Sequence, residues 1–300
     1  MKNSTTQRIL CRIGNIPFLR LGIIFALLLN CITGLSFHNE AENSVEEAFE
    51  LRINGKVDQA IDLLTTILKE DTTNAEAYFE LARTLNYKSL SGSDEADKAL
   101  QSALKYDPDN IIYAYYNAKN CFLKAYIAMH RGTDEVKNKV NTACNEFVKV
   151  LEMKSDYPEA MMYLVEFYGI LPEDMGGDKT KARDFIQKLE KMDKFYGAKA
   201  RLVLMPEETD RIKYWNDYIA ENGESCQALK ELGVASIFND NIEEAEKAFQ
   251  KAIAIDNSQN IRLLDLSRYH QMKVMQNRDA AENELPKAKK YIEQYLASVP

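Results

Sequence analysis

The chain has 300 residues, of which 46% are hydrophobic and 28% charged, and it contains 12 Gly and 7 Pro. Gly and Pro are too sparse for an all-β protein with many tight turns, so the composition favours a helix-rich chain. Four basic residues and no acidic residue lie in the first 36 positions, which leaves the remainder with a net charge of −12 against −8 overall. This acidic body repels phosphates, so we expect neither nucleic acid nor anionic lipid as a partner.

The N-terminal segment has the layout of a secretion signal. A basic stretch over residues 2–20 precedes an apolar stretch over residues 21–37, which is the order found in signal peptides. Gly34 and Ser36 have the spacing of a cleavage site, so residues 1–36 are expected to be a signal peptide. The positive charges predict that the rest of the chain is exported, to the periplasm.

Two alternatives stay open for this segment. Its apolar stretch is about long enough to span a bilayer, so it could remain as an anchor with the body facing the periplasm. That anchor would be the chain's only contact with the membrane. Residues 28–31 also resemble a bacterial lipobox ending at Cys31, although Asn30 replaces the small residue expected before the cysteine.

The body of the chain repeats a helical pattern. Three segments share an opening sequence and a helical spacing of apolar residues, over 55–70, 94–106 and 243–255. In the last of them, Ala245, Phe249 and Ala252 place a small, a large and a small residue at intervals of four and three. Small residues let two antiparallel helices cross closely, while the large residue fills the gap to the next pair.

These segments resemble the second helix of a tetratricopeptide repeat (TPR). Ala96, Leu100 and Ala103 have the same spacing, and Leu232-Gly233 is similar to the family's first-helix signature. A Pro-to-Gly-Gly loop over 172–177 is similar to one in some bacterial exported TPR proteins. The resemblance implies an all-α fold: a right-handed α-solenoid of about seven antiparallel helix hairpins over residues 41–300, preceded by the signal or anchor segment.

Periodicity and turn residues predict the less regular helix pairs. Thr133 is expected to cap a helix, and Pro286 to lie near a helix start, where its missing N–H costs little. The expected pairs are 111–131 with 134–154, 159–171 with 178–192, 195–205 with 208–221, and 259–277 with 284–299.

No catalytic or metal-binding motif emerges from the sequence. The three histidines are scattered, with no His-Glu-x-x-His pair, and a solvated or capping role is expected for each. Gly176-Gly177-Asp178 only partly resembles a nucleotide-binding loop, because no Gly-Lys-Thr run and no preceding strand occur. We therefore predict no enzymatic activity, no cofactor and no metal.

Cys121 and Cys144 lie almost symmetrically about Gly132, between the two arms of an expected hairpin. A disulfide bond between them is one alternative in an oxidising compartment. Two free thiols in a helical core are the other, and the commoner one.

The candidate partner-binding residues are aromatic and basic. The first helix of each hairpin lines the concave side of a solenoid, and aromatic residues among Lys and Arg are typical of peptide-binding surfaces. Core packing is the alternative for each ring, because tyrosines also fill wide gaps between degenerate repeats. The candidates are Arg83, Tyr115, Lys119, Phe122, Tyr163, Phe167 and Lys230.

The leading functional hypothesis is a non-catalytic scaffold of the cell envelope that binds a segment of a protein partner in its concave groove. Two alternatives remain. One is a ligand-binding accessory of a periplasmic transport system, similar to TPR proteins associated with TRAP transporters. The other is a self-assembling structural repeat protein.

Overall fold

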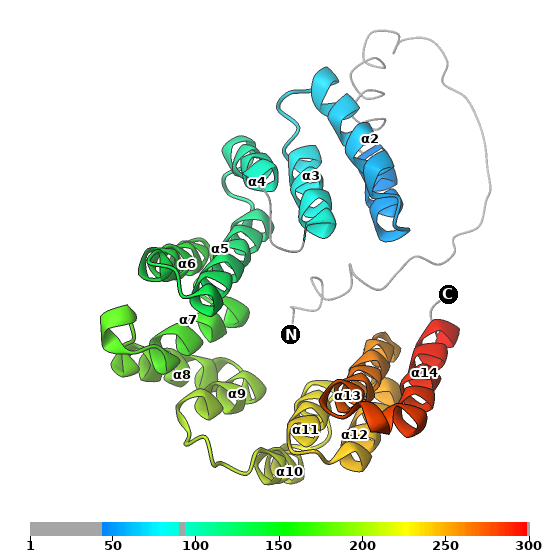
Figure 1. Ribbon diagram of the computed structural model, residues 1–300. Helices are drawn as coiled ribbons and strands as arrows, with labels where there is room; N and C mark the ends of the chain where they lie inside the picture. The colour runs from blue at the N-terminus through cyan, green and yellow to red at the C-terminus, as the bar shows by residue number, and fades with distance from the viewer. Residues whose placement is uncertain (1–43, 90–93, 299–300) are drawn as a thin grey trace, which may run out of the picture. The chain divides into compact units, whose positions relative to one another are not determined.

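Figure 1 shows the computed structural model of the protein, which describes residues 44–89 and 94–298. The expected signal segment, its cleavage site and Cys31 lie outside the described residues. Helices joined by turns make up the described part, which contains no strand, so the predicted all-α class is confirmed. No helix within these ranges is both long and apolar enough to cross a bilayer.

The chain divides into two compact units, residues 1–72 and 73–300. The first contains a helix over 44–53 and α2 (Val57–Glu70). Gly55 lies between them at φ 76°, a conformation that glycine adopts without steric cost. Ala60, Leu64 and Ile67 are the buried residues of α2, with Ile67 at the position where the other two segments have an alanine.

The second unit is a succession of α-helices with three short 3-10 helices. In chain order they are α3 (Ala75–Lys88), α4 (Asp94–Tyr106), α5 (Ile111–Arg131), α6 (Val136–Met153), α7 (Pro158–Ile170), η1 (Glu173–Met175), α8 (Lys179–Met192), α9 (Lys194–Leu204), α10 (Arg211–Asn222), α11 (Cys226–Phe238), α12 (Ile242–Ile255), η2 (Asn257–Ile261), α13 (Arg262–Gln276), η3 (Arg278–Ala280) and α14 (Ala281–Ser298).

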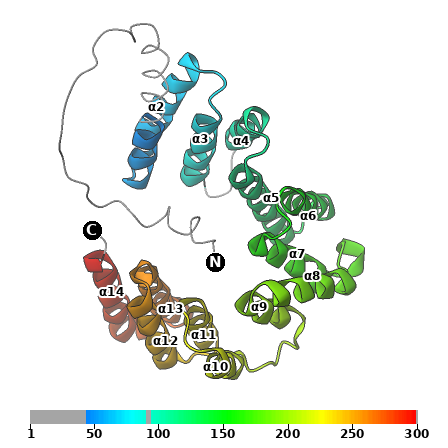
Figure 2. The same ribbon diagram turned by 180° about the vertical axis from the view of Figure 1, so that it is seen from behind.

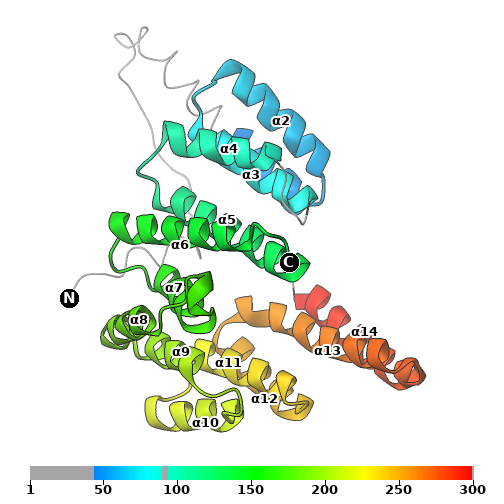
Figure 3. The same ribbon diagram turned by 60° about the vertical axis from the view of Figure 1, so that its left-hand side comes forward.

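Most of these helices pack in consecutive pairs. The backbones of α3 and α4, α5 and α6, α7 and α8, α11 and α12, and α13 and α14 approach closely. Figures 1 and 2 show the helices of this unit following one another in chain order, and Figure 3 shows α5 and α6 side by side. This succession fits an α-solenoid, whose handedness stays a prediction.

The small-large-small spacing works as the sequence predicts. Ala245, Phe249 and Ala252 are fully buried on α12, and Ala96, Leu100 and Ala103 are buried on α4. On α11, Gly233 faces the ring of Phe249 so closely that an added Cβ atom would overlap it. Side-chain size at these positions therefore sets how closely the helices of a pair approach.

The pair expected over 195–205 and 208–221 departs from this pattern. The backbone of α9 packs on α7 and α8, whereas that of α10 packs on α11. Aromatic side chains join α9 to α10: the rings of Phe195 and Trp215 are 5.7 Å apart, and the Tyr214 hydroxyl donates to the Ala198 carbonyl at 2.7 Å. Bulky rings between these helices replace the close crossing of a regular hairpin.

Two local expectations are wrong. Thr133 does not cap α6, because the helix begins only at Val136, after Glu135, and has no side-chain hydrogen bond at that end. The backbone N–H of Thr133 bonds to the Ala128 carbonyl at the end of α5. Pro286 lies inside α14, which begins five residues earlier, at Ala281. A contact with another helix stabilises this extra turn, because Glu284, which lies on it, bonds to His270 of α13.

That bond also corrects the role expected for His270. The imidazole is only 4% exposed, and its Nδ1 lies 2.5 Å from Oε2 of Glu284. The ring of Tyr291 stacks on it with 9° between the planes. His270 is therefore a buried link between α13 and α14, neither solvated nor capping.

Candidate partner-binding site

Four of the seven predicted site residues form one aromatic cluster. Tyr115 and Phe122 extend from α5, and Tyr163 and Phe167 extend from α7. All four belong to the hydrophobic core around Phe147 of α6. The Tyr163 ring stacks on Phe147 at 4.5 Å, and that of Phe122 lies 4.8 Å from Tyr163. The sequence did not predict that these rings meet one another.

The cluster is largely interior. Phe167 is 5% exposed, while Tyr115, Phe122 and Tyr163 are half-buried. Burial raises the pKa of Tyr115 and Tyr163, because the phenolate would lose hydration. These rings join the α5–α6 hairpin to α7, and contact of their exposed edges with a partner stays a prediction.

The three basic candidates do not gather with one another. The Lys119 amino group lies 5.6 Å from the centre of the Tyr115 ring, at the edge of the aromatic cluster. Arg83, on α3, pairs with Glu80 at 3.1 Å. Lys230, on α11, lies 3.7 Å from the carboxylate of Glu231.

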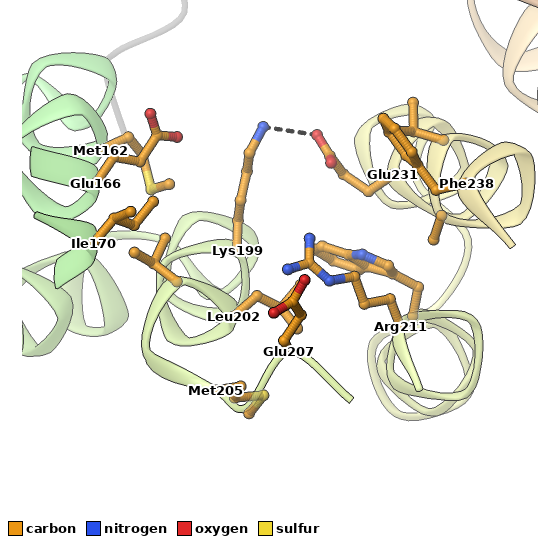
Figure 4. A pocket seen from close by; sticks show the side chains of 14 residues that line it. Met162, Glu166, Ile170, Lys199, Leu202, Met205, Glu207, Arg211, Glu231 and Phe238 are labelled. Carbon is orange, nitrogen blue, oxygen red and sulfur yellow. Dashed lines mark hydrogen bonds and ion pairs between the residues drawn. The ribbon is translucent and has the colours of Figure 1, made fainter. Parts of the chain in front are cut away.

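A pocket of about 470 Å³ lies between α7, α9, α10 and α11. It occurs beside the irregular α9–α10 pair, where aromatic side chains hold the helices apart. All four helices contribute residues at intervals of three or four, and the loop between α9 and α10 closes one side (Figure 4). The lining residues are Met162, Glu166, Ile170, Lys199, Leu202, Val203, Met205, Glu207, Arg211, Trp215, Glu231, Val234, Ala235 and Phe238.

Helix α7 separates the pocket from the aromatic cluster. Met162, Glu166 and Ile170 recur every four residues and line the pocket. Tyr163 and Phe167 follow one position later in the sequence, which rotates them by about 100° around the helix axis. One helix thus supplies both sites, with a different stripe for each.

One ion pair spans the pocket. The Lys199 amino group on α9 lies 2.7 Å from the carboxylate of Glu231 on α11, drawn as a dashed line in Figure 4. The side chains are 34% and 15% exposed, so water screens the pair only in part. On α7, Glu166 points into the same space (Figure 4), and burial raises the pKa of its carboxyl group against the opposing effect of Lys199.

The rim of the pocket exposes apolar side chains. Phe238, at the end of α11, is 83% exposed, and Ile170, at the end of α7, is 67% exposed. Trp215, by contrast, is 2% exposed among the lining residues. The site therefore combines an apolar rim and wall with a few charged groups, as ligand-binding sites commonly do.

Sequence reasoning missed this pocket for a physical reason. The carboxylates of Glu166 and Glu231 are ordinary helix residues in the sequence, 65 positions apart. They line one pocket because α7 packs on α9, whose Lys199 pairs with Glu231 of α11. The sequence offered one signal that was not used, a phenylalanine, Phe238, directly before the polar turn that ends an apolar helix.

Within the described ranges, no group of three or more His, Cys, Asp and Glu side chains could hold a metal ion. Cys121, Cys144 and Cys226 are free thiols. Burial raises the pKa of Cys144 to about 11, which keeps it protonated at neutral pH.

One curated protein has sequence similarity to this chain over most of the chain's length. No family model matches the chain. The TPR repeat-containing protein MJ1428 of Methanocaldococcus jannaschii is 25% identical over 228 residues, which cover 73% of this chain and 39% of that protein. The chain thus matches less than half the length of this curated relative.

Two solved structures have a partial likeness to the chain. The TPR protein TTC0263 of Thermus thermophilus is 15% identical, with a TM-score of 0.43, covering 76% of this chain and 98% of its own. The pilF protein of Pseudomonas aeruginosa is 13% identical, with a TM-score of 0.43, covering 74% and 94%. The small-large-small repeats, the helix pairs and the similarity to a curated TPR protein together support assignment to the TPR repeat proteins.

Proposed function

We propose that this protein is a non-catalytic scaffold that binds a segment of a protein partner in the pocket between α7, α9, α10 and α11. TPR proteins generally mediate protein–protein interactions. The observation that carries the proposal is the open pocket of about 470 Å³ with Phe238 83% exposed at its rim.

An exposed phenylalanine beside a pocket favours association. Burying a large apolar side chain fully contributes about 1.5–3 kcal/mol to the free energy of association. Phe238 is mostly exposed, so a partner that covers it can gain most of this energy. Single exposed apolar residues are common on protein surfaces, but here Phe238 and Ile170 flank one concave site. A partner segment that enters the pocket would cover both.

The experiment places a photo-crosslinking amino acid at position 238 of the full chain, in cells of the source organism. We expect cross-links to a defined partner. The matched control places the same group at Tyr87, which is 57% exposed on α3 and does not line the pocket. Equal products from both positions would contradict the proposal, and a cross-link between two copies of this chain would favour the self-assembling alternative.

The purified partner then allows a quantitative test. Phe238→Ser should weaken its binding by about tenfold or more, as expected for a central aromatic contact. The same change should leave the midpoint of urea unfolding nearly unchanged, because the side chain is exposed. Unaltered affinity would show that the segment binds elsewhere on the protein.

We propose further that the scaffold acts outside the cytoplasm, in the periplasm or anchored at the membrane and facing it. The basic-then-apolar leader over residues 1–36 supports this location. Residues 1–45 fused to a reporter that is active only after export should give an active reporter. An inactive reporter that still accumulates would contradict export.

A further inference from the structure

Glu166 is a carboxylate without a partner in a half-buried position. Among the described residues it accepts no hydrogen bond and forms no ion pair, although the charge of Lys199 acts on it from a distance. Across the pocket, Glu231 of α11 pairs with that same Lys199 at 2.7 Å. Its side chain lies in the middle of the α7 stripe that lines the pocket, between Met162 and Ile170 (Figure 4). The pocket therefore contains a carboxylate, that of Glu166, which no basic side chain of the described residues pairs with directly.

The surrounding charges point to a cation as the missing partner. Three carboxylates line the pocket, those of Glu166, Glu207 and Glu231, against two basic groups, those of Lys199 and Arg211. Lys199 is already bound to Glu231, and Arg211 lies exposed on the loop side. An acidic ligand at Glu166 would meet a second carboxylate across the pocket, which opposes its binding.

The walls suit the stem of a long basic side chain. Met162, Leu202 and Val203 line the space beside Glu166 and Lys199. Lysine and arginine bury their methylene stems against apolar surface and keep the charged end at a polar group. A charge-assisted hydrogen bond from that end to a carboxylate is among the stronger hydrogen bonds in proteins.

We propose that the pocket binds a lysine or arginine side chain of the partner segment, with its charged group on Glu166 and a neighbouring apolar residue of the segment on Phe238. This inference rests on the proposed scaffold function and names the chemistry of its partner. The occupant is a basic-apolar peptide segment.

The first experiment selects short random peptides displayed on phage against the immobilised full chain. Peptides that bind the wild type should be enriched in Lys or Arg beside an apolar residue. Selection against Glu166→Gln should lose the basic preference, and selection against Glu221→Gln should keep it. Glu221 is exposed on α10, outside the pocket, so this control removes the same charge elsewhere.

The second experiment measures the pairing directly. One selected peptide and its Lys→norleucine analogue are titrated by fluorescence anisotropy against wild type and Glu166→Gln. We expect Glu166→Gln to weaken the lysine peptide by about tenfold and to leave the norleucine peptide unchanged, since a hydrogen bond to a charged group is lost only in the first case. Equal urea midpoints for the two proteins show that folding is not the cause.

The outcomes separate this inference from the function on which it rests. Enrichment of acidic peptides, or basic peptides that bind wild type and Glu166→Gln equally, overturns the inference and leaves a peptide-binding scaffold. If the wild type selects no peptide sequence at all, both proposals fail. Self-association of the wild type that Phe238→Ser abolishes, seen by sedimentation, would assign the surface to a second copy and also overturn the inference.

Discussion

A Cβ atom added to Gly233 would lie 2.3 Å from Cε1 of Phe249. Gly233 is on α11 and Phe249 on α12, and the phenylalanine is fully buried. Close-packed interiors hold few voids into which such a ring could turn. The absent side chain at Gly233 is therefore what lets these two helices approach.

Gly233→Ala should lower the free energy of unfolding by about 1–2 kcal/mol. Overpacking a core costs about 1–3 kcal/mol, which the better helix propensity of alanine offsets by up to about 1 kcal/mol. Urea unfolding of the full chain, followed by circular dichroism, measures the change.

Gly169→Ala is the matched control. Its added Cβ would meet Cδ2 of Leu204 at 2.9 Å and Cγ1 of Val203 at 3.0 Å, both ends of half-buried side chains that can shift. We expect a smaller loss there. Equal losses of stability at the two glycines would show that the Phe249 ring moves aside to accept the added methyl group.

Tyr115→Ala combined with Phe122→Ala should destabilise the protein by about 2–4 kcal/mol, less than the sum for two fully buried rings. Both rings are half-buried and pack on α6 and α7. Tyr87→Ala, at a side chain 57% exposed, should change stability little. A double variant that keeps its stability but loses the partner would instead identify these rings as a binding surface.

Cys144 should react slowly with a thiol reagent at pH 8, since burial raises its pKa to about 11 and only the thiolate reacts. Burial also raises the pKa of Cys121, and it should react slowly as well. A full chain with Cys11→Ser and Cys31→Ser leaves only the three thiols of the body. All three should titrate rapidly in urea without reductant, and the loss of two would show a Cys121–Cys144 disulfide bond.

Acid should weaken the link between α13 and α14. The bonds from His270 and Lys287 lower the pKa of Glu284 below its ordinary value of 4.5. Because the folded state favours the carboxylate, this contribution is complete above about pH 4.5 and is lost as the pH falls through the lowered pKa. Unfolding free energies measured from pH 7 to pH 3 should fall less steeply for Glu284→Gln than for wild type. Parallel curves would contradict the assignment.

The regular helices were predictable because their signals are local. The expected helix over 243–255 is observed as Ile242–Ile255, and Ala245 and Phe249 have the burial that the repeat implies. Asn241 caps this helix through its side chain, as its position before an acidic turn indicates. In such segments the interaction that fixes the structure lies within a few residues.

The irregular features depend on contacts distant in sequence. The bond between Glu284 and His270 stabilises the first turn of α14, which places Pro286 inside the helix. The sequence around Pro286 gives no sign of that bond. The separation of α9 from α10 depends on Trp215 meeting Phe195. The pocket follows from that separation, so the sequence predicted the repeats around it and missed the site itself.

The two stripes of α7 connect the aromatic cluster to the pocket. Phe167 and Glu166 are adjacent in the chain, yet one packs toward α5 and α6 and the other lines the pocket. A small rotation of α7 that relieves crowding among the rings must carry the Glu166 carboxylate with it. Substitutions in the aromatic cluster can therefore retune the affinity of the pocket without touching its occupant.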